Sequence, residues 1–271
     1  MIRSLLYVPA YSERFISKAH ERGADAIILD LEDAVAPEHK EAARAGLAAS
    51  VMAVRRGGAK VFVRINAGSD ADALAACHAG ADGLYVPKVQ RAETLAGLAA
   101  MLGPAERRIG RPEMNFVALL EDPGAVLDAR LIAGAPRVMA LSLGGEDLAL
   151  ALGARPTPDV LRMPKLLVHY AAKAAGLLSF GLLRSVADFT NLGAMEAAAR
   201  EAREHGFDGA TCVHPDVVPL LNAAFAPSAE ELAWAARVLA EAERHPGAFA
   251  LDGAMIDEPI IARARAILGV V

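Results

Sequence analysis

Two carboxylates stand where two short apolar runs of the chain end. Glu121 closes the run NFVALLE (residues 115–121), and Asp147 follows the run VMALSLG (residues 138–144) in the segment GGED. Mg²⁺ in proteins is commonly held by one or two carboxylates and completes its octahedral coordination with water and ligand oxygens. Glu121 and Asp147 therefore predict a magnesium site, whereas GGED taken alone is more typical of a turn in which an acidic residue caps a helix.

The two glycines and an arginine in another apolar run suit an anionic ligand. Gly144 and Gly145 have no Cβ, so backbone N–H groups there could approach a substrate carboxylate beside the metal. Arg64 lies near the end of the run KVFVRIN. Residues two apart on a strand share a face, so Arg64 and Glu121 converge if both faces line one cavity. This convergence favours the active-site interpretation of GGED.

Alternating strand-like and helix-like segments must position these residues. The strand-like runs are residues 4–9, 26–32, 60–66, 83–88, 115–121, 138–144, 177–183 and 209–215. The stretches with helical periodicity are residues 12–23, 37–55, 71–79, 90–102, 123–134, 159–175 and 191–205. Apolar strands that are each followed by a helix indicate a parallel sheet covered on both faces, and eight such units close a (β/α)8 TIM barrel. The active site of that fold lies at the carboxyl ends of the strands, where Arg64, Glu121 and Asp147 stand.

The chain continues beyond its eighth strand. We therefore expect a catalytic barrel domain at residues 1–225 and a C-terminal helical extension at residues 226–271. The extension contains a helical stretch near residues 228–244, a loop at residues 245–256 and a last helix that starts near Asp257. It could cover the mouth of its own barrel or reach a neighbouring protomer, and we favour the second interpretation.

The acidic segment DLEDAV (residues 30–35) also falls at a strand end. Glu32 and Asp33 could support the metal ligands by orienting metal-bound waters. Equally, an acid of this segment, Asp30 included, could cap the following helix or pair with a lysine. The residues alone leave both interpretations open.

The composition limits the classes of partner. The chain has 271 residues, 54% of them apolar, and a formal net charge of −5 at pH 7. This charge provides no basic stripe for nucleic acid, and no segment approaches the ~18 consecutive apolar residues of a membrane span. The first residues carry no signal-peptide pattern, and Cys77 and Cys212 stand far apart, outside any CxxC motif. We therefore expect a protein of the reducing cytoplasm that binds small molecules, and neither nucleic acid nor membranes.

The series of motifs resembles that of a known family, the citrate lyase β-subunit-like lyases, which include malyl-CoA and citramalyl-CoA lyases. The matching segments are RSLLYVPAYSERFISKA, DLEDAV, VRIN, VPKV, ALLED, LSLGGEDL, CVHP and GAMIDEPII. They follow one another over nearly the whole chain with fitting spacings. The family fold is a (β/α)8 barrel, so the resemblance implies the same fold as the strand count.

The resemblance also implies roles for individual residues. Glu121 and Asp147 would be the Mg²⁺ ligands, with Glu121 also contacting the substrate. Arg64 would bind the substrate and stabilise an enolate, and Lys18, on the first helix, would contact the CoA portion. Asp257, in MIDEP, would reach the site of an adjacent protomer as the acid/base, although its own sequence context is typical of a helix cap followed by proline.

The activity implied is Mg²⁺-dependent cleavage of a carbon–carbon bond in a 3-hydroxyacyl-CoA thioester such as (S)-citramalyl-CoA or malyl-CoA. The products would be acetyl-CoA and a 2-oxo acid, pyruvate or glyoxylate. The alternatives are the β subunit of a multienzyme citrate lyase, which acts on a citryl thioester, a pyruvate-dependent class II aldolase, and a thioesterase. The resemblance further implies a homo-oligomer, a homotrimer or a hexamer, in which a neighbouring chain completes each site.

Overall fold

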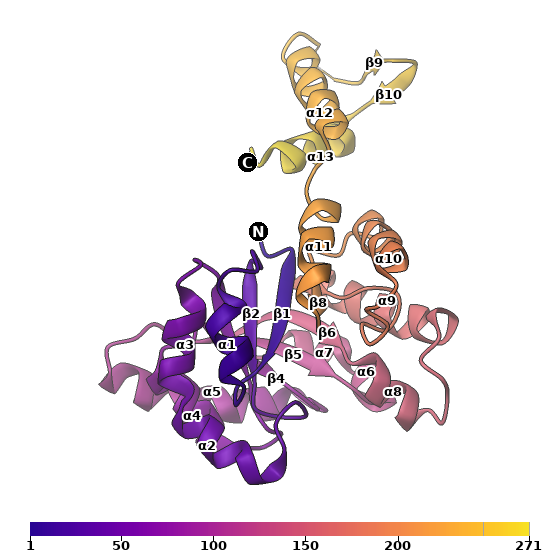
Figure 1. Cartoon of the computed structure of the whole chain (residues 1–271). Coiled ribbons are helices and arrows are strands. Elements are labelled where there is room, and N and C mark those ends of the chain that lie inside the picture. Colours follow the sequence, from indigo (N-terminus) through magenta and orange to yellow (C-terminus); the bar gives the residue numbers. More distant parts are fainter. Residues whose placement is uncertain (246, 271) are drawn as a thin grey trace. The chain divides into compact units, whose positions relative to one another are not determined.

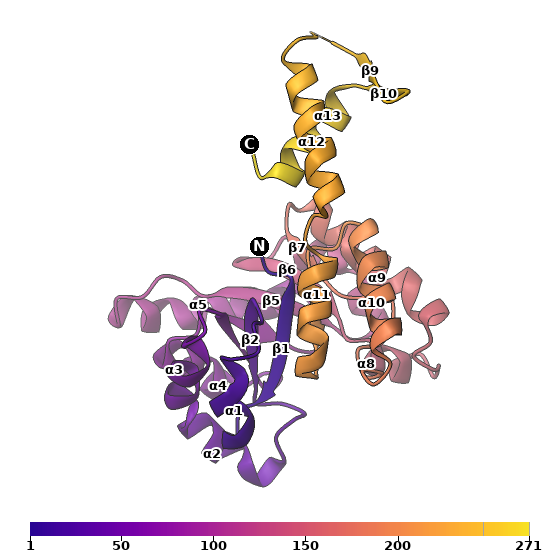
Figure 2. The ribbon, with the colours of Figure 1, turned by 45° about the horizontal axis from the view of Figure 1, so that its top comes forward.

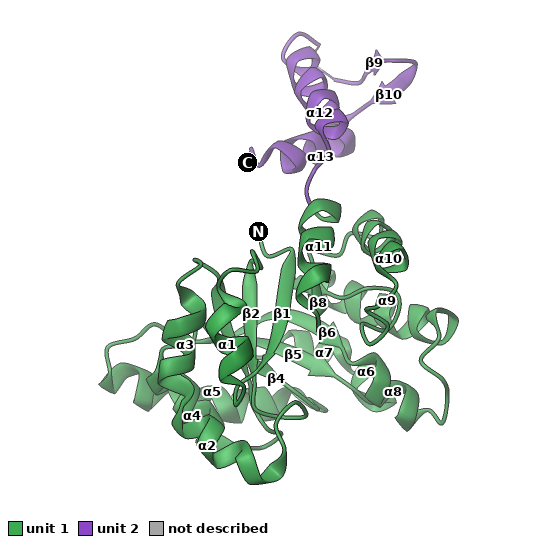
Figure 3. Cartoon of the chain, viewed as in Figure 1, with its two compact units in different colours: residues 1–225 green, residues 226–271 purple. Residues whose placement is uncertain are grey.

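The computed structural model describes residues 1–245 and 247–270. The chain divides into two compact units, residues 1–225 and residues 226–271, which are green and purple in Figure 3. The first unit holds the strand ends at which the sequence places the metal site. The second unit holds Asp257.

Eight parallel strands form the sheet of the first unit (Figure 1). They are β1 (Ser4–Pro9), β2 (Ala26–Asp30), β3 (Lys60–Arg64), β4 (Gly83–Val86), β5 (Asn115–Leu120), β6 (Val138–Leu143), β7 (Leu178–Phe180) and β8 (Ala210–Cys212). The strands lie in the order β7-β6-β5-β4-β3-β2-β1-β8. Between β7 and β8 the described residues form an isolated bridge, Phe180–Gly209. The predicted (β/α)8 TIM barrel is therefore confirmed as a nearly closed barrel, with every predicted strand present.

Helices surround these strands (Figures 1 and 2). They are α1 (Glu13–Ala19), η1 (Pro37–His39), α2 (Lys40–Ala45), α3 (Leu47–Arg55), α4 (Asp70–Ala79), α5 (Ala92–Arg108), α6 (Pro123–Leu127), α7 (Ala129–Ala133), α8 (Gly145–Ala151), α9 (Pro158–Ala174), α10 (Leu192–Glu204), η2 (Pro215–Val217) and α11 (Val218–Ala224). Two predicted helices are each divided, the first into η1, α2 and α3 and the second into α6 and α7. Among the helices described, none is both long enough and apolar enough to cross a membrane.

Two apolar clusters pack the first unit, one on each face of the sheet. The larger combines outward-facing strand residues with the helices around them. The smaller fills the inside of the barrel and consists of Leu5, Ala26, Ile28, Phe62, Tyr85, Val117, Leu119, Ala140 and Phe180. Phe62 stands two residues before Arg64, and Leu119 stands two residues before Glu121. The alternation of side chains therefore carries Arg64 and Glu121 to the inside of the barrel at its carboxyl-terminal end, as predicted.

The second unit has a small core of its own. Its helices are α12 (Ala229–Ala242) and α13 (Glu258–Leu268), and its fully buried apolar residues are Ala235, Val238, Ile256, Ile261 and Ala264. α12 begins with a capping box, in which the Ser228 side chain and the Glu231 side chain each accept a hydrogen bond from the other residue's backbone N–H. The guanidinium of Arg263 lies over the Trp234 ring, 4.7 Å from its centroid. This contact and the apolar core join the two helices of the unit.

A hairpin lies between these helices, where the sequence analysis expects a loop. β9 (Phe249–Leu251) and β10 (Ala254–Ile256) pair antiparallel. The expectation of an irregular loop is wrong here because Asp252 and Gly253 both take positive φ, 52° and 79°, which suits a two-residue hairpin turn. Pro246, in the same predicted loop, lies outside the described residues.

Candidate active site

A cavity of about 460 Å³ opens at the carboxyl ends of the barrel strands. The predicted site residues that line it are Asp33, Arg64, Glu121, Gly144, Gly145 and Asp147. Glu32 contacts Arg64, Lys18 lines a different cavity, and Asp257 belongs to the second unit. The barrel therefore brings both predicted metal ligands and the predicted substrate cation to one place.

Glu121 follows β5 into this cavity and is 5% exposed. Its Oε2 accepts a hydrogen bond of 2.6 Å from the backbone N–H of Lys88. Lys88 has a left-handed backbone conformation, with φ of 52°, which is uncommon for a residue other than glycine. Burial raises the pKa of Glu121 to about 7, and the carboxylates of Glu32 and Asp147 add to this rise against the Lys88 hydrogen bond. A bound cation would stabilise the ionised form of such a carboxylate.

Gly144 is required by the position of Glu121. A Cβ at Gly144 would lie 2.7 Å from Glu121 Cγ and 2.8 Å from Oε1. The backbone N–H of Gly144 donates to the Leu120 carbonyl at 2.9 Å. It is therefore not available to a substrate carboxylate, and the prediction of such a contact is wrong for Gly144. The β5–β6 pairing uses that amide. A Cβ at Gly145 would instead lie 2.9 Å from Leu161 Cδ1, so both glycines permit close packing of side chains.

Asp147 lies in the first turn of α8 and faces the same cavity as Glu121. Its carboxylate forms no hydrogen bond or ion pair with the described residues, so its oxygens are open to a ligand. Nowhere in residues 1–245 and 247–270 do three or more His, Cys, Asp or Glu side chains gather to hold a metal. Structural and catalytic Zn²⁺ sites need three or four protein ligands, whereas two carboxylates suffice for Mg²⁺. The donor set at this cavity therefore fits magnesium.

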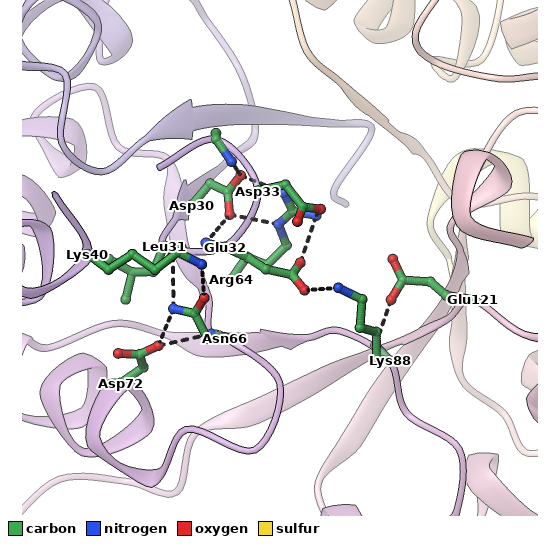
Figure 4. Close-up of polar contacts among 11 residues, drawn as sticks. Asp30, Leu31, Glu32, Asp33, Lys40, Arg64, Asn66, Asp72, Lys88 and Glu121 are labelled. Carbon is green, nitrogen blue, oxygen red and sulfur yellow. Dashed lines mark hydrogen bonds and ion pairs between the residues drawn. The ribbon is translucent and has the colours of Figure 1, made fainter. Parts of the chain in front are cut away.

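Arg64 is held at the end of β3 by three carboxylates (Figure 4). Its Nε and Nη2 donate to Asp30 Oδ1 and Oδ2 at 2.7 and 2.6 Å. Its Nη1 donates to Asp33 Oδ2 at 3.4 Å and lies 3.1 Å from Glu32 Oε2. Burial alone would lower the pKa of Arg64, but the hydrogen bonds with Asp30 raise it above its ordinary value. The guanidinium also lies 5.1 Å from the centroid of the Tyr7 ring, so its charge and orientation are both fixed.

The acidic residues at the end of β2 and just after it accept hydrogen bonds from a turn and from the side chains of Arg64 and Lys88. Asp30 Oδ1 and Oδ2 accept hydrogen bonds from the backbone N–H groups of Glu32 and Ala34, at 2.8 and 3.2 Å. Glu32 Oε1 accepts a 2.8 Å hydrogen bond from Lys88 Nζ, which links Glu32 through Lys88 to the Glu121 side of the cavity (Figure 4). The predicted pairing with a lysine is thus observed, whereas Asp30 caps the turn and no acid of this segment caps the following helix. That Glu32 and Asp33 also orient metal-bound waters stays a prediction.

A second cavity, of about 340 Å³, lies beside α1. Arg14, Lys18 and Arg22 line it at intervals of four residues, which places three cations on one side. None of the three forms an ion pair with an acidic side chain in the part of the chain that is described. His214 also lines this cavity and stacks on Phe189, with ring centroids 5.1 Å apart. The two cavities share lining residues from β1 and from the segment after β8, so this second cavity, the basic cleft, lies next to the cavity that holds Glu121 and Asp147.

Asp257 occupies the N-cap position of α13 in the second unit. Its backbone carbonyl accepts hydrogen bonds from the N–H groups of Ile260 and Ile261, at 3.0 and 2.9 Å. Its side chain makes no capping hydrogen bond, and its carboxylate forms no ion pair with the residues described. The position therefore agrees with the helix-cap interpretation of the sequence, while the carboxylate itself is open.

The residues alone do not identify Tyr7 and Lys165 as parts of the cavity. Tyr7 in β1 packs edge-on against Tyr85, with ring centroids 5.8 Å apart, and lies against the guanidinium of Arg64. Lys165 in α9 is 5% exposed and lines the cavity. Nothing in the apolar run SLLYVP distinguishes Tyr7 from a residue of the core. Lys165 could have been identified as a candidate from the sequence, because a lysine among the apolar positions of a helix face is unusual.

The chain also matches known proteins over most of its length. Residues 3–215 match the family described as HpcH/HpaI aldolase/citrate lyase. The chain is 38% identical to a (3S)-malyl-CoA thioesterase of Cereibacter sphaeroides, over 98% of this chain and 93% of that protein. It is 31% identical to the citrate lyase subunit beta of Leuconostoc mesenteroides subsp. cremoris, over 98% of this chain and 92% of that protein.

A solved structure extends this likeness to three dimensions. The crystal structure of protein CitE from Mycobacterium tuberculosis, in complex with magnesium, acetoacetate and coenzyme A, matches with a TM-score of 0.81 and 32% identity. The match covers 98% of this chain and 97% of that chain. Magnesium is thus bound in a structural neighbour, and the Glu121 and Asp147 carboxylates fit the same metal. The motifs, the barrel and these matches together show that the chain belongs to the HpcH/HpaI aldolase/citrate lyase family.

Proposed function

We propose that this chain is a Mg²⁺-dependent carbon–carbon lyase that cleaves a 3-hydroxyacyl-CoA, such as (S)-citramalyl-CoA or malyl-CoA, to acetyl-CoA and pyruvate or glyoxylate. The observation that carries the proposal is that Glu121 and Asp147 share one cavity with the charged Arg64. The basic cleft beside α1 supports it further, because three unpaired cations are complementary to the phosphates of CoA. The magnesium and coenzyme A in the Mycobacterium tuberculosis protein agree with both assignments.

Glu121 and Asp147 would hold the metal ion from the end of β5 and from the first turn of α8. When bound there, Mg²⁺ supplies Lewis-acid polarisation of the oxygen that becomes the carbonyl of the 2-oxo acid. Lys88 keeps one oxygen of Glu121 in place through its backbone N–H. Gly144 leaves the space that the Glu121 side chain needs.

Arg64 would stabilise the charge that carbon–carbon cleavage creates. When the bond breaks, its electron pair stays with the acetyl-CoA fragment as an enolate. A guanidinium has five N–H groups, and three hydrogen bonds to Asp30 and Asp33 leave donors for the enolate oxygen. A fixed cation in a site that excludes water acts strongly on such a charge, and removing one typically costs ~10²–10³-fold in rate.

Asp257 would act as the acid/base from a neighbouring chain of a homo-oligomer, in which one protomer's second unit completes another's site. Its carboxylate is open within its own unit, as a proton-transfer group requires. In the cleavage direction Asp257 would protonate the enolate carbon of the acetyl-CoA fragment, and in the condensation direction it would remove that proton.

The 38% identity to a (3S)-malyl-CoA thioesterase favours a second candidate function, hydrolysis of the thioester. Water would then attack the thioester carbonyl and release CoA with a hydroxy acid, while the metal site and the basic cleft keep their roles. The likeness to a citrate lyase subunit beta favours the same carbon–carbon cleavage on a citryl thioester, with partner chains.

One product analysis separates these activities. The purified chain is incubated with Mg²⁺ and malyl-CoA or citramalyl-CoA, and the products are resolved by liquid chromatography. A lyase yields acetyl-CoA and a 2-oxo acid in equal amounts, whereas a thioesterase yields free CoA and the hydroxy acid. If neither product forms until citrate lyase partner subunits are added, the stand-alone lyase is refuted. A class II aldolase without CoA chemistry would gain thermal stability from pyruvate but not from acetyl-CoA.

A further inference from the structure

Lys165 is a cation on the buried face of α9. The buried residues of this helix include Leu161, Lys165, Val168 and Ala172, which recur at the three- and four-residue spacing of one helical face. Lys165 is 5% exposed, so packing between α9 and the strands encloses almost all of its side chain. Lysine is almost never buried to this degree unless a partner neutralises its charge.

Among residues 1–245 and 247–270, no carboxylate is paired with this amine. In the described residues Lys165 forms no hydrogen bond and no ion pair. Burial lowers its pKa to about 8, and the Glu146 carboxylate opposes this shift from a distance. Glu146 itself accepts a hydrogen bond from the Ser185 hydroxyl. A buried cation without a partner destabilises the fold, and such groups in a cleft are candidates for function.

The amine of Lys165 reaches the active-site cavity. Lys165 lines it together with Glu121 and Asp147. Its Nζ is not among the polar atoms of the described residues that are both fully enclosed and unpartnered, so the amine keeps contact with the cavity. Among the described residues that line this cavity, the basic side chains are Arg64 and Lys165.

The two basic residues differ in how their charges are balanced. Arg64 forms a two-pronged ion pair with Asp30 and has Glu32 and Asp33 beside it. Lys165 has no such partner. In the proposed reaction the metal's charge is matched by Glu121 and Asp147, so the carboxylate of the 2-oxo acid brings one further negative charge into the cavity. Glu146 also lines the cavity but forms no ion pair with Lys165, so Lys165 is the unpaired cation that this carboxylate would meet.

We propose that Lys165 binds the carboxylate of the 2-oxo acid moiety of the substrate, from the α9 side of the cavity. The inference rests on the proposed function, since malyl, citramalyl and citryl thioesters all carry this carboxylate beside the hydroxyl carbon. Lys165 therefore anchors the fragment that leaves as the 2-oxo acid, and the basic cleft anchors the CoA end.

The test compares pyruvate with methyl pyruvate, its uncharged ester, by calorimetric titration of the full chain in saturating Mg²⁺. Lys165→Met keeps the length of the side chain and removes a buried charge, so the variant should fold at least as stably. Loss of a hydrogen bond to a charged group should weaken pyruvate binding roughly 10- to 100-fold, with little change for methyl pyruvate and for Mg²⁺.

A matched control lies on the same helix. Lys173 is 38% exposed and pairs with Asp208 at 2.6 Å, outside the cavity. Lys173→Met should bind pyruvate as the wild type does. If Lys165→Met binds pyruvate as tightly as the wild type, the inference is refuted. If the wild-type chain binds Mg²⁺ but not pyruvate, the proposed function fails first, and the inference with it.

Discussion

Gly144→Ala should damage the metal site without disturbing the fold. The backbone at Gly144 has φ −78° and ψ 102°, which alanine adopts without strain. The added methyl would lie 2.7 Å from Glu121 Cγ and 3.2 Å from its Cδ. Optimal contacts between carbon atoms are about 3.5–4.0 Å, so the Glu121 side chain must move by about 1 Å.

This displacement sets the size of the expected effect. Overpacking by one methyl group typically costs about 1–3 kcal/mol. Glu121 is fixed from the other side by Lys88 N–H, so it cannot move away while keeping that 2.6 Å hydrogen bond. If the whole cost falls on metal binding, the dissociation constant for Mg²⁺ rises roughly 5- to 150-fold.

Calorimetric titration with Mg²⁺ measures this change directly, and thermal unfolding without metal reports on the fold. Gly134→Ala is the matched control, because its Cβ would lie 3.5 Å from the nearest heavy atom, the Leu131 carbonyl oxygen, and its φ is −80°. We expect wild-type Mg²⁺ affinity for Gly134→Ala. Equal Mg²⁺ affinity in Gly144→Ala and the wild type would show that this glycine does not serve Glu121.

Four further outcomes are expected. Because burial raises the pKa of Glu121 to about 7, Mg²⁺ must displace a proton below that pH, so its calorimetric affinity should rise about tenfold per pH unit up to about 7 and then level off. Without metal, a raised carboxyl pKa stabilises the folded state most below the unfolded pKa of about 4.3, so denaturant midpoints should fall between pH ~4 and ~7. Lys18→Ala should weaken coenzyme A binding and leave Mg²⁺ binding unchanged, and equal loss of both would contradict a CoA role. Asp147→Ala and Asp257→Ala chains should each be inactive but recover turnover when mixed, and mixed oligomers without activity would refute a site shared between protomers.

The barrel could be predicted because its signals are local. Each strand is a short apolar run with β-branched or aromatic residues, and a helix-like segment follows it. The period of two then places Arg64 and Glu121 on the inner face without any knowledge of distances. The hairpin of the second unit also had a signal, since Asp252-Gly253 stands between two apolar triplets. Each triplet is shorter than a typical strand, which makes the hairpin hard to distinguish from a loop in the sequence.

The site details that escaped prediction depend on contacts between distant elements. Gly144 was expected to offer its N–H, but that donor serves the β5–β6 pairing, and the glycine is needed for the space beside Glu121. Lys165 reaches the cavity from α9, a helix whose other buried residues do not line it. Sequence periodicity identifies the face of a helix, whereas distances decide whether a side chain on that face ends in the core or in a cavity.

The charges around the cavity explain why a divalent cation belongs there. The carboxylates of Asp30, Glu32 and Asp33 pair with the cations of Arg64 and Lys88, and Glu121 accepts a hydrogen bond from the Lys88 backbone N–H. Glu32 pairs with both Arg64 and Lys88. Glu121 and Asp147 form no ion pair with the cations of the described residues, Lys165 of the same cavity included, and burial and repulsion raise the pKa of Glu121. A 2+ ion at this pair would offset their charges, so metal binding and ionisation of Glu121 should be one coupled event.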